Sequence, residues 1–225
     1  DSGSGSGIYN EGGTIGTLTN NGRITGITTG TYDYSYGIRN EGGTIGTLTN
    51  NGRITGTSEN RNGHGIYNMN DPIGTLINNG RITGTSTNGY GYGIDTSMNN
   101  AVIKILVNNG TITGTSENSD GYGIYTNNDA TLANTGVIYG KTNAIVNVGT
   151  ANNYGLLISQ TGDTVSGGTS ITNSYGLIFK DTGGSYTAEI SDYSKFGTIA
   201  KDEEVVVDYD ENSQAIKKTY TIINA

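Results

Sequence analysis

Residues 7–26 read GIYNEGGTIGTLTNNGRITG, and variants of this unit return about every 28 to 30 residues. A Gly-Ile pair opens each unit, and an Asn-x-Gly turn with a following aliphatic residue closes it. Such a period is typical of repeat architectures, in which one unit cannot bury its apolar residues alone and must stack on its neighbours. The Gly-Ile pairs are Gly7-Ile8, Gly37-Ile38, Gly65-Ile66, Gly93-Ile94 and Gly123-Ile124.

The residue types within a unit favour strands over helices. Short segments rich in Thr and Ile are separated by Asn-Gly turns, and no apolar residues recur at helical spacing. Each unit offers three such segments. The sequence therefore predicts an all-β protein, a right-handed parallel β-helix (β-solenoid) with three short strands per coil. Each strand should pair with its counterpart in the next coil, about 4.8 Å away.

Three columns of aliphatic residues are expected to fill the core of this solenoid, and the first Asn of each turn should form a ladder of side-chain hydrogen bonds. The predicted core columns are Ile8, Ile38, Ile66, Ile94 and Ile124; Leu18, Leu48, Leu76, Leu106 and Leu132; and Ile24, Ile54, Ile82, Ile112 and Ile138. The predicted ladder is Asn20, Asn50, Asn78, Asn108 and Asn134.

The repeat pattern divides the chain into three parts. Residues 1–7 are expected to be a linker, residues 8–180 the repeat array, and residues 181–225 a C-terminal capping segment with a hairpin around 210–213. In later coils the outward positions turn apolar, and we expect the C-terminal segment to cover them. These positions are Val137, Tyr139, Leu156, Ile158, Leu177 and Phe179.

Composition argues against several functions. The net charge of −8 disfavours nucleic acid as a partner, and no apolar run approaches the roughly 18 residues of a membrane helix. With one His and no Cys among 225 residues, Ser–His or Cys–His catalytic pairs and His/Cys metal sites are not expected. Acidic residues do not stack in register as a polysaccharide-cleaving β-helix would need. The sequence predicts no enzyme activity, no catalytic residue, no metal site and no cofactor.

The units Asn-Asn-Gly-Thr-Ile-Thr-Gly at 108–114 and Gly-Ile-Tyr-Asn at 7–10 resemble the passenger region of Gram-negative autotransporter adhesins of the type V secretion class. The regular Gly/Asn/Thr/Ile repeats are most similar to the large adhesins of fusobacteria. The resemblance covers roughly residues 7–180. It implies an extracellular passenger displayed at the bacterial cell surface or outer membrane, and it implies no particular receptor.

Aromatic residues gather where each third strand leads into the next Gly-Ile pair. Exposed Tyr rings beside Asn, Asp and Ser could stack on sugar rings, so these residues are candidate ligand-binding residues. The alternative, which we favour, is that they stack on one another from coil to coil. The candidates are Tyr34, Tyr36, His64, Tyr90, Tyr92 and Tyr122.

A second candidate surface is a column of Arg23, Arg53 and Arg81, which strand alternation should turn outward. This column could hold an anionic partner such as a sialylated or sulfated glycan, unless neighbouring acidic residues neutralise it. An outward Thr column formed by Thr25, Thr55, Thr83 and Thr113 resembles ice-binding solenoids locally.

These observations predict a bacterial surface adhesin fragment, a rigid monomeric rod whose Tyr/Asn-rich loops bind a host-cell surface protein, a glycan or another bacterial cell. The alternative is a purely structural spacer that raises a distal binding domain above the cell. An enzyme acting on polysaccharide and an ice-binding solenoid are less favoured.

Overall fold

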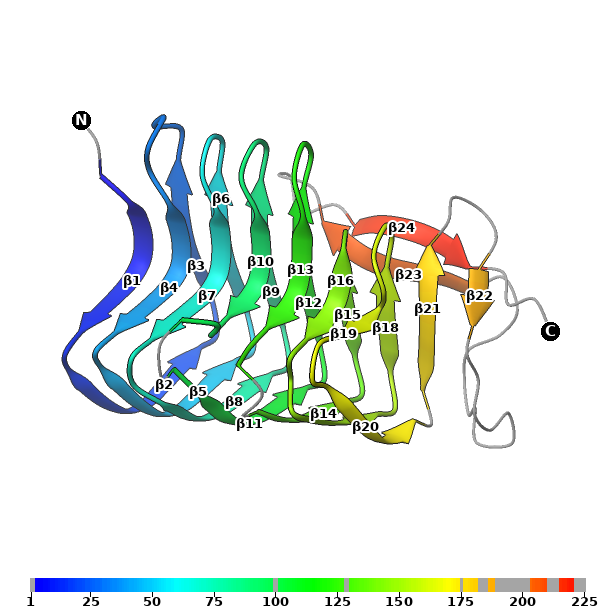
Figure 1. Cartoon of the computed structure of the whole chain (residues 1–225). Coiled ribbons are helices and arrows are strands. Elements are labelled where there is room, and N and C mark those ends of the chain that lie inside the picture. The colour runs from blue at the N-terminus through cyan, green and yellow to red at the C-terminus, as the bar shows by residue number, and fades with distance from the viewer. Residues whose placement is uncertain are drawn as a thin grey trace.

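The computed structural model describes residues 3–98, 101–127, 130–174, 176–181, 186–188, 203–209 and 215–220. Within these ranges every regular element is a β-strand. Three parallel sheets run along a rod, and each turn of the chain contributes one strand to each sheet (Figure 1). The predicted β-solenoid with three strands per coil is therefore confirmed. We number the coils from coil 1, formed by β1–β3, to coil 7, formed by β19–β21.

The sheets are named A, B and C. Sheet A contains β1 (Gly5–Glu11), β4 (Ser35–Glu41), β7 (Gly63–Met69), β10 (Gly91–Asp95), β13 (Gly121–Tyr125), β16 (Asn143–Val146) and β19 (Val165–Ser166). Sheet B contains β2 (Thr14–Asn20), β5 (Thr44–Asn50), β8 (Ile73–Asn78), β11 (Ile103–Asn108), β14 (Thr131–Asn134), β17 (Thr150–Asn153) and β20 (Ser170–Ser174). Sheet C contains β3 (Arg23–Thr28), β6 (Arg53–Ser58), β9 (Arg81–Ser86), β12 (Thr111–Ser116), β15 (Val137–Gly140), β18 (Leu156–Ser159), β21 (Leu177–Asp181) and the antiparallel β22 (Tyr186–Ala188).

The first strand begins earlier than the repeat pattern indicates. Gly5 and Ser6, which lie in the segment expected to be a linker, pair with Ser35 and Tyr36 in sheet A. Coil 1 therefore includes residues that precede the first Gly-Ile pair.

Identical residues stack on one another through the core, as predicted. From coil 2 to coil 5 the three expected columns are fully buried, while their coil 1 members pack against them partly exposed. Sheet B adds a fourth column that the sequence analysis did not include, formed by Ile45, Ile73 and Ile103. Because each aliphatic side chain contributes roughly 1.5–3 kcal/mol when buried, four per coil supply most of the driving force for stacking.

Buried asparagine ladders hold two corners of the coil. In the predicted ladder each Nδ2 donates to Oδ1 of the next Asn at 2.8 Å, from Asn20 through Asn50, Asn78, Asn108 and Asn134 to Asn153. A second, shorter ladder joins Asn10, Asn40 and Asn68 at 2.7 Å per step. These bonds satisfy amide groups that burial would otherwise leave without partners.

The C-terminal segment contains the expected hairpin, an antiparallel pair of β23 (Glu203–Tyr209) and β24 (Ala215–Tyr220). Strand β23 lies against β12 of sheet C. The outward side chains that follow on this sheet are buried although they point away from the core: Tyr139, Leu156, Ile158, Leu177 and Phe179 are at most 6 % exposed. This apolar face is therefore covered within the chain.

Candidate functional site

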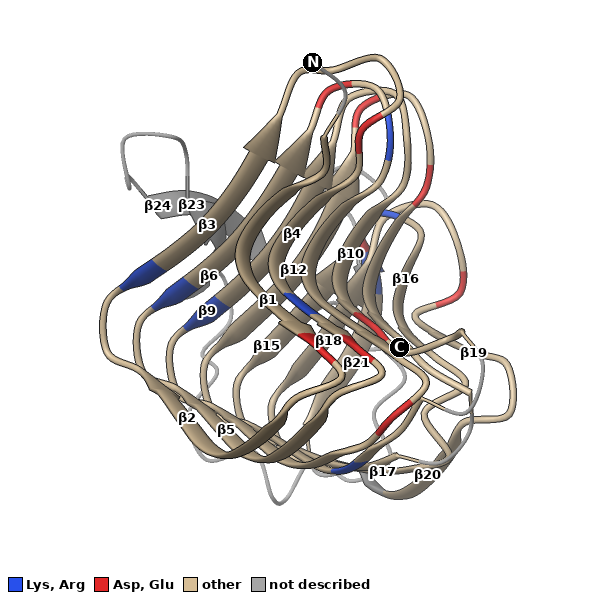
Figure 2. Cartoon of the chain, turned by 90° about the vertical axis from the view of Figure 1, so that its left-hand side faces the viewer, with Lys and Arg blue, Asp and Glu red and all other residues tan. Residues whose placement is uncertain are grey.

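The strands of sheet A are bent, and the bend shapes their outer face (Figure 2). Consecutive strand residues normally point to opposite faces. Here both face the core: Ile66 is fully buried, and a Cβ built on Gly65 would lie 2.6 Å from Cγ2 of Ile82. The residues on either side, His64 and Tyr67, consequently both project outward, and their rings are 5.0 Å apart. The outer face of sheet A is therefore concave.

Aromatic rings fill this concave face. Tyr36, His64, Tyr92 and Tyr122 stack in succession with centroid separations of 5.1, 4.9 and 5.2 Å and interplanar angles of 22°, 10° and 17°. Tyr67 and Tyr125 meet the stack from the other arm of the bend, Tyr125 edge-on to Tyr122 at 5.2 Å. We call these six residues the aromatic seam. Offset-stacked and edge-to-face pairs of this kind each add roughly 0.5–1.5 kcal/mol beyond the area they bury.

Arg39 closes the N-terminal end of the aromatic seam. Its guanidinium carbon lies 5.1 Å from the ring centroid of Tyr36 and 4.7 Å from that of Tyr9, and the guanidinium forms an ion pair with Glu41. A cation between two ring faces is attracted by both quadrupoles. Arg39 thus extends the coil-to-coil stack into coil 1, where the position equivalent to Tyr36 is Ser6.

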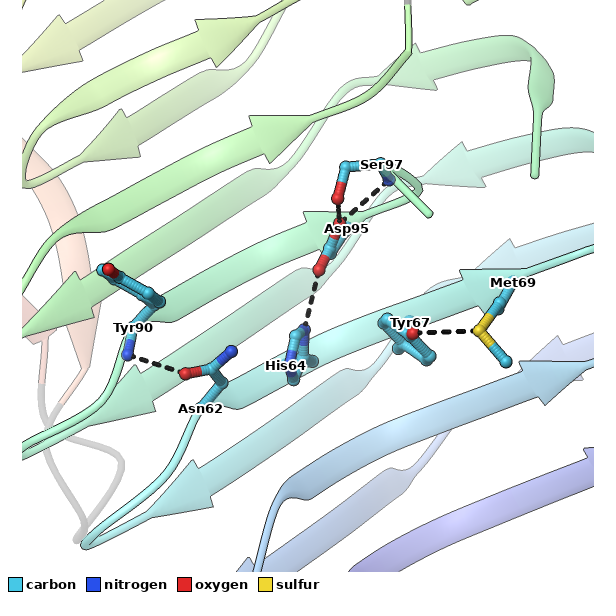
Figure 3. A network of polar contacts seen from close by, with 7 residues as sticks. All are labelled: Asn62, His64, Tyr67, Met69, Tyr90, Asp95 and Ser97. Atoms are coloured by element: carbon cyan, nitrogen blue, oxygen red, sulfur yellow. Dashed lines mark hydrogen bonds and ion pairs between the residues drawn. The ribbon is translucent and has the colours of Figure 1, made fainter. Parts of the chain in front are cut away.

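The imidazole of His64 faces the carboxylate of Asp95 (Figure 3). Its Nδ1 lies 3.4 Å from Oδ2 of Asp95, and the two side chains are only 3 % and 5 % exposed. The other carboxylate oxygen of Asp95 accepts hydrogen bonds from the backbone nitrogen and the hydroxyl of Ser97 at 3.0 and 2.7 Å. The carboxylate is therefore held by its own strand end and faces the imidazole.

Burial changes the acidity of four seam tyrosines, Tyr36, Tyr67, Tyr92 and Tyr122. Desolvation raises the pKa of Tyr67 to about 12, with a smaller contribution from the negative charge of Asp95. Desolvation is also the main cause that raises the pKa of Tyr36, Tyr92 and Tyr122. These phenols are protonated at neutral pH and serve the protein as apolar rings.

The seam leaves few ring faces free for a ligand. Tyr36 and His64 are 6 % and 2 % exposed, and each has an aromatic or guanidinium neighbour on both faces. The predicted sugar-stacking role therefore lacks accessible ring faces at these two residues, and the coil-to-coil stack that we favoured is present. Exposed rings lie farther out, on the loops that lead from sheet C to sheet A: Tyr90 is 42 % and Tyr32 72 % exposed. Tyr34 is half-buried, and Arg61 lies over it and Tyr32.

The Arg column lies at the beginnings of β3, β6 and β9, where basic residues follow one another in Figure 2. Its exposure falls along the rod: Arg23 is exposed, Arg53 half-buried and Arg81 only 7 % exposed. The Nε atoms of Arg23 and Arg53 donate to Oγ1 of Thr25 and Thr55 at 2.9 Å. Only the first of the three guanidinium groups thus offers a largely open surface to an anionic ligand.

The outward Thr column is also largely buried. Thr55, Thr83 and Thr113 are at most 4 % exposed, and Thr25 alone is half-buried. A flat ice-binding face needs hydroxyl groups in contact with solvent, which this column does not provide.

Sequence reasoning missed two of the six seam residues, Tyr67 and Tyr125, and also the neighbouring Asp95 and Arg39. The signal that could have found them is the Gly-Ile pair itself. Because two adjacent residues face the core, the residue after Ile points to the same side as the residue before Gly. Simple alternation assigns these two positions to opposite faces.

The described residues contain no group of three or more His, Asp or Glu side chains that could hold a metal ion, and none of their elements is a helix able to cross a membrane. No protein-family model matches the chain, and no curated protein or solved structure matches it either.

Proposed function

We propose that this chain is a rigid, non-enzymatic segment of a bacterial surface adhesin, similar in kind to the passenger regions of type V autotransporters, and that it acts as a stalk. The observation that carries the proposal is the continuity of its contacts. Buried aliphatic columns, two Asn ladders and the aromatic seam all pass from coil to coil in register. A rod stabilised by nearest-neighbour contacts of this kind transmits force along its axis without a hinge.

The location that fits such a stalk is the outside of the bacterial outer membrane, where a monomeric rod would hold a binding surface at a distance from the cell. Seven coils at about 4.8 Å each give this segment a length of roughly 30 Å. Small-angle scattering of the purified chain should give an elongated monomer. A compact sphere, or a globular particle with helical circular dichroism, would contradict the proposal.

A second candidate function is adhesion by the segment itself, and the exposed loop residues favour it. Tyr32, on the loop after β3, and Tyr90, on the loop after β9, are exposed. The exposed Asn88 and Asn118 form a hydrogen-bonded row with Asn60 on the loops of this side. Such a surface suits a host-cell protein, a glycan or another bacterial cell.

Binding measurements on glycan arrays and host cells separate the two functions. The stalk role predicts that the wild-type chain does not bind. Binding that disappears in Tyr90→Ala, with unchanged circular dichroism and thermal stability, would establish the adhesive role. Tyr92→Ala is the matched control, because it removes a ring from the aromatic seam and should act through stability.

A further inference from the structure

The outer face of sheet B carries two straight rows of side chains. The residues on either side of the buried Leu18 column point outward, because side chains alternate along a strand. From β2 to β17 the strands pair in register without a bulge, so equivalent residues follow one another along the rod (Figure 1). We call these two rows the threonine face. The first row is Thr17, Thr47, Thr75, Ile105, Thr131 and Thr150, and the second is Thr19, Thr49, Ile77, Val107, Ala133 and Asn152.

The threonine face is open to solvent, unlike the Thr column of sheet C. Thr47, Thr49 and Thr75 in the middle of the rod are half-buried, and Thr131 is exposed. Ile105, which continues the first row, is 49 % exposed. The hydroxyl groups of Thr47, Thr49 and Thr75 have no hydrogen-bond partner among the described residues. They can therefore bind water without giving up a bond within the protein.

This face lacks the groups that usually anchor a macromolecule. Among the residues of the seven sheet B strands, Lys104 is the one charged residue, and none is aromatic. Lys104 precedes Ile105 and lies outside the two rows. Protein interfaces are centred on buried aromatic and Arg side chains, and sugar rings stack on aromatic rings. The threonine face therefore suits neither a folded protein partner nor a polysaccharide.

The side chains of the threonine face are held rigidly. Thr, Ile and Val are branched at Cβ and adopt few rotamers. Next to the second row lies an exposed Asn row in the turns between sheets B and C, formed by Asn21, Asn51, Asn79 and Asn109, whose side chains bond to one another at 2.8–2.9 Å. A rigid and regular surface fits a partner that is itself rigid and regular, namely a crystal lattice.

The spacings of the threonine face are close to those of ice. Neighbouring strands are about 4.8 Å apart, and alternate residues of one strand are about 6.7 Å apart. In a tetrahedral water network with O–H···O distances of about 2.75 Å, second-neighbour oxygens lie about 4.5 Å apart, and the hexagonal lattice repeats after about 7.3 Å in the perpendicular direction. Both spacings of the protein thus agree with the lattice to within roughly 10 %.

We propose that the threonine face binds ice. The Thr hydroxyls hydrogen-bond to water molecules of the lattice, and the methyl groups of Thr, Ile, Val and Ala occupy the spaces between them. An uncharged face is required because ice excludes ions, and Figure 2 shows no charged residue on the labelled strands β2 and β5. This activity is independent of the stalk role: a rod that does not bind ice can still be a stalk.

Ice-growth measurements on the purified chain test the proposal. The wild-type chain should slow the recrystallisation of ice and lower the freezing point below the melting point. Thr75→Tyr places a large ring in the middle of the first row, and Tyr is well tolerated in strands. This variant should raise the concentration needed for inhibition by at least about tenfold, which corresponds to about 1.4 kcal/mol of lost binding free energy. The absence of any effect of the wild-type chain on ice would overturn the proposal.

Two further variants separate loss of the face from loss of the fold. Thr87→Tyr makes the same substitution on the loop after β9, away from sheet B, and should retain the activity of the wild-type chain. Ile105→Lys introduces a charge at a side chain that is already 49 % exposed, so it should fold normally and lose activity. Circular dichroism and thermal denaturation confirm folding of each variant. Equal activity of folded Ile105→Lys and Thr87→Tyr would show that the threonine face is not the ice-binding surface.

Discussion

Coils 1–5 and coils 6–7 follow the same path around the core with different lengths of chain. Successive residues of the buried Asn ladder are 26 to 30 residues apart up to Asn134, but only 19 residues separate Asn134 from Asn153. Both the strands and the connections become shorter: β16, β17 and β18 have 4 residues each, whereas β10, β11 and β12 have 5, 6 and 6. Residues 117–120 join β12 to β13, whereas only 141–142 join β15 to β16. The ladder itself keeps its 2.8 Å spacing. The stacking at this corner is therefore kept although the chain around the core becomes shorter.

The two regions also differ on their outer surfaces. In coils 2–5 the concave face of sheet A carries the aromatic seam, while coil 6 has Asn143 and Val146 at those positions. On the outer face of sheet C, apolar residues appear in the late coils instead: Arg and Thr in the early coils are replaced by buried Leu, Ile and Phe. Early coils are thus reinforced by rings outside sheet A, and late coils by a covered apolar face outside sheet C.

The largest expected effect tests the covered face of the late coils. Ile158 points outward from sheet C but is fully buried, so Ile158→Asp places a charge where it cannot be hydrated. We expect a loss of about 4 kcal/mol or more in the free energy of unfolding, measured by urea denaturation. Thr25→Asp at the corresponding place in coil 1 should cost less than about 1 kcal/mol, because Thr25 is only half-buried and Arg23 lies beside it. Similarly small losses in both variants would mean that the late face is open to water.

The corner between sheets C and A should show the next largest difference. A Cβ on Gly84 would lie 1.7 Å from the carbonyl oxygen of Tyr92, so Gly84→Ala must displace backbone and should cost about 1–3 kcal/mol. In coil 6 this place is taken by Ser159, whose hydroxyl bonds to Gly162 and Thr164, so coil 6 accommodates a side chain there. Ser159→Ala should therefore cost less than Gly84→Ala in thermal denaturation. The reverse order would show that the corner has the same geometry in both regions.

In the early coils, substitutions in the buried and the exposed Asn rows should differ by a smaller amount in their effect on the free energy of unfolding. Asn78 accepts from Asn50, donates to Asn108 and Thr111, and is fully buried. Asn78→Ala leaves those partners unsatisfied and should cost about 1–3 kcal/mol. Asn79→Ala, one residue later on the surface, should cost less than about 0.5 kcal/mol. Chemical denaturation of both variants measures the two losses. Equal losses would show that the buried ladder contributes no more to stability than the exposed row.

Alkaline pH should weaken the early coils selectively. Burial raises the pKa of Tyr67 to about 12, whereas an unfolded Tyr ionises near 10. Between these values the unfolded state has lost protons that the folded state retains, so stability should fall as pH rises from about 10 and level off above about 12. Hydrogen exchange should become faster first in β7, β10 and β13, and later in β18. Tyr67→Phe should reduce the pH dependence, and an unchanged profile in that variant would exclude Tyr67 as a cause.

The repeat pattern was sufficient to predict the strands, the three aliphatic columns and the Asn20 ladder. Each depends on residues that recur at equivalent positions, and stacking aligns such residues wherever the coil closes. The fourth column and the Asn10 ladder lay in the same repeats but were not assigned. Ile15 and Leu18 are three positions apart, a spacing that simple alternation assigns to opposite faces, yet both pack against the core.

The candidate site was harder to predict because it depends on the bend in sheet A and on distant parts of the chain that cover sheet C. Tyr36 was identified as an outward residue, but its neighbours Tyr67 and Arg39 come from the other arm of the bend. Likewise Arg81 occupies the same strand position as Arg23 and is nevertheless buried, because sheet C is covered farther along the rod. Side chains at equivalent strand positions point in the same direction, but the exposed fraction of each depends on the part of the chain that packs on it.

Residues 11–26 recur without change as residues 41–56, and the two segments lie directly on one another. In genetic terms, an in-frame duplication or loss of one such coil would join surfaces that are already complementary, so the mutation would require no compensating change. Most insertions in a globular domain disturb a core that was fitted to one length. Here the number of coils can vary between related genes by recombination alone, and natural selection can act on the length of the rod independently of its cross-section.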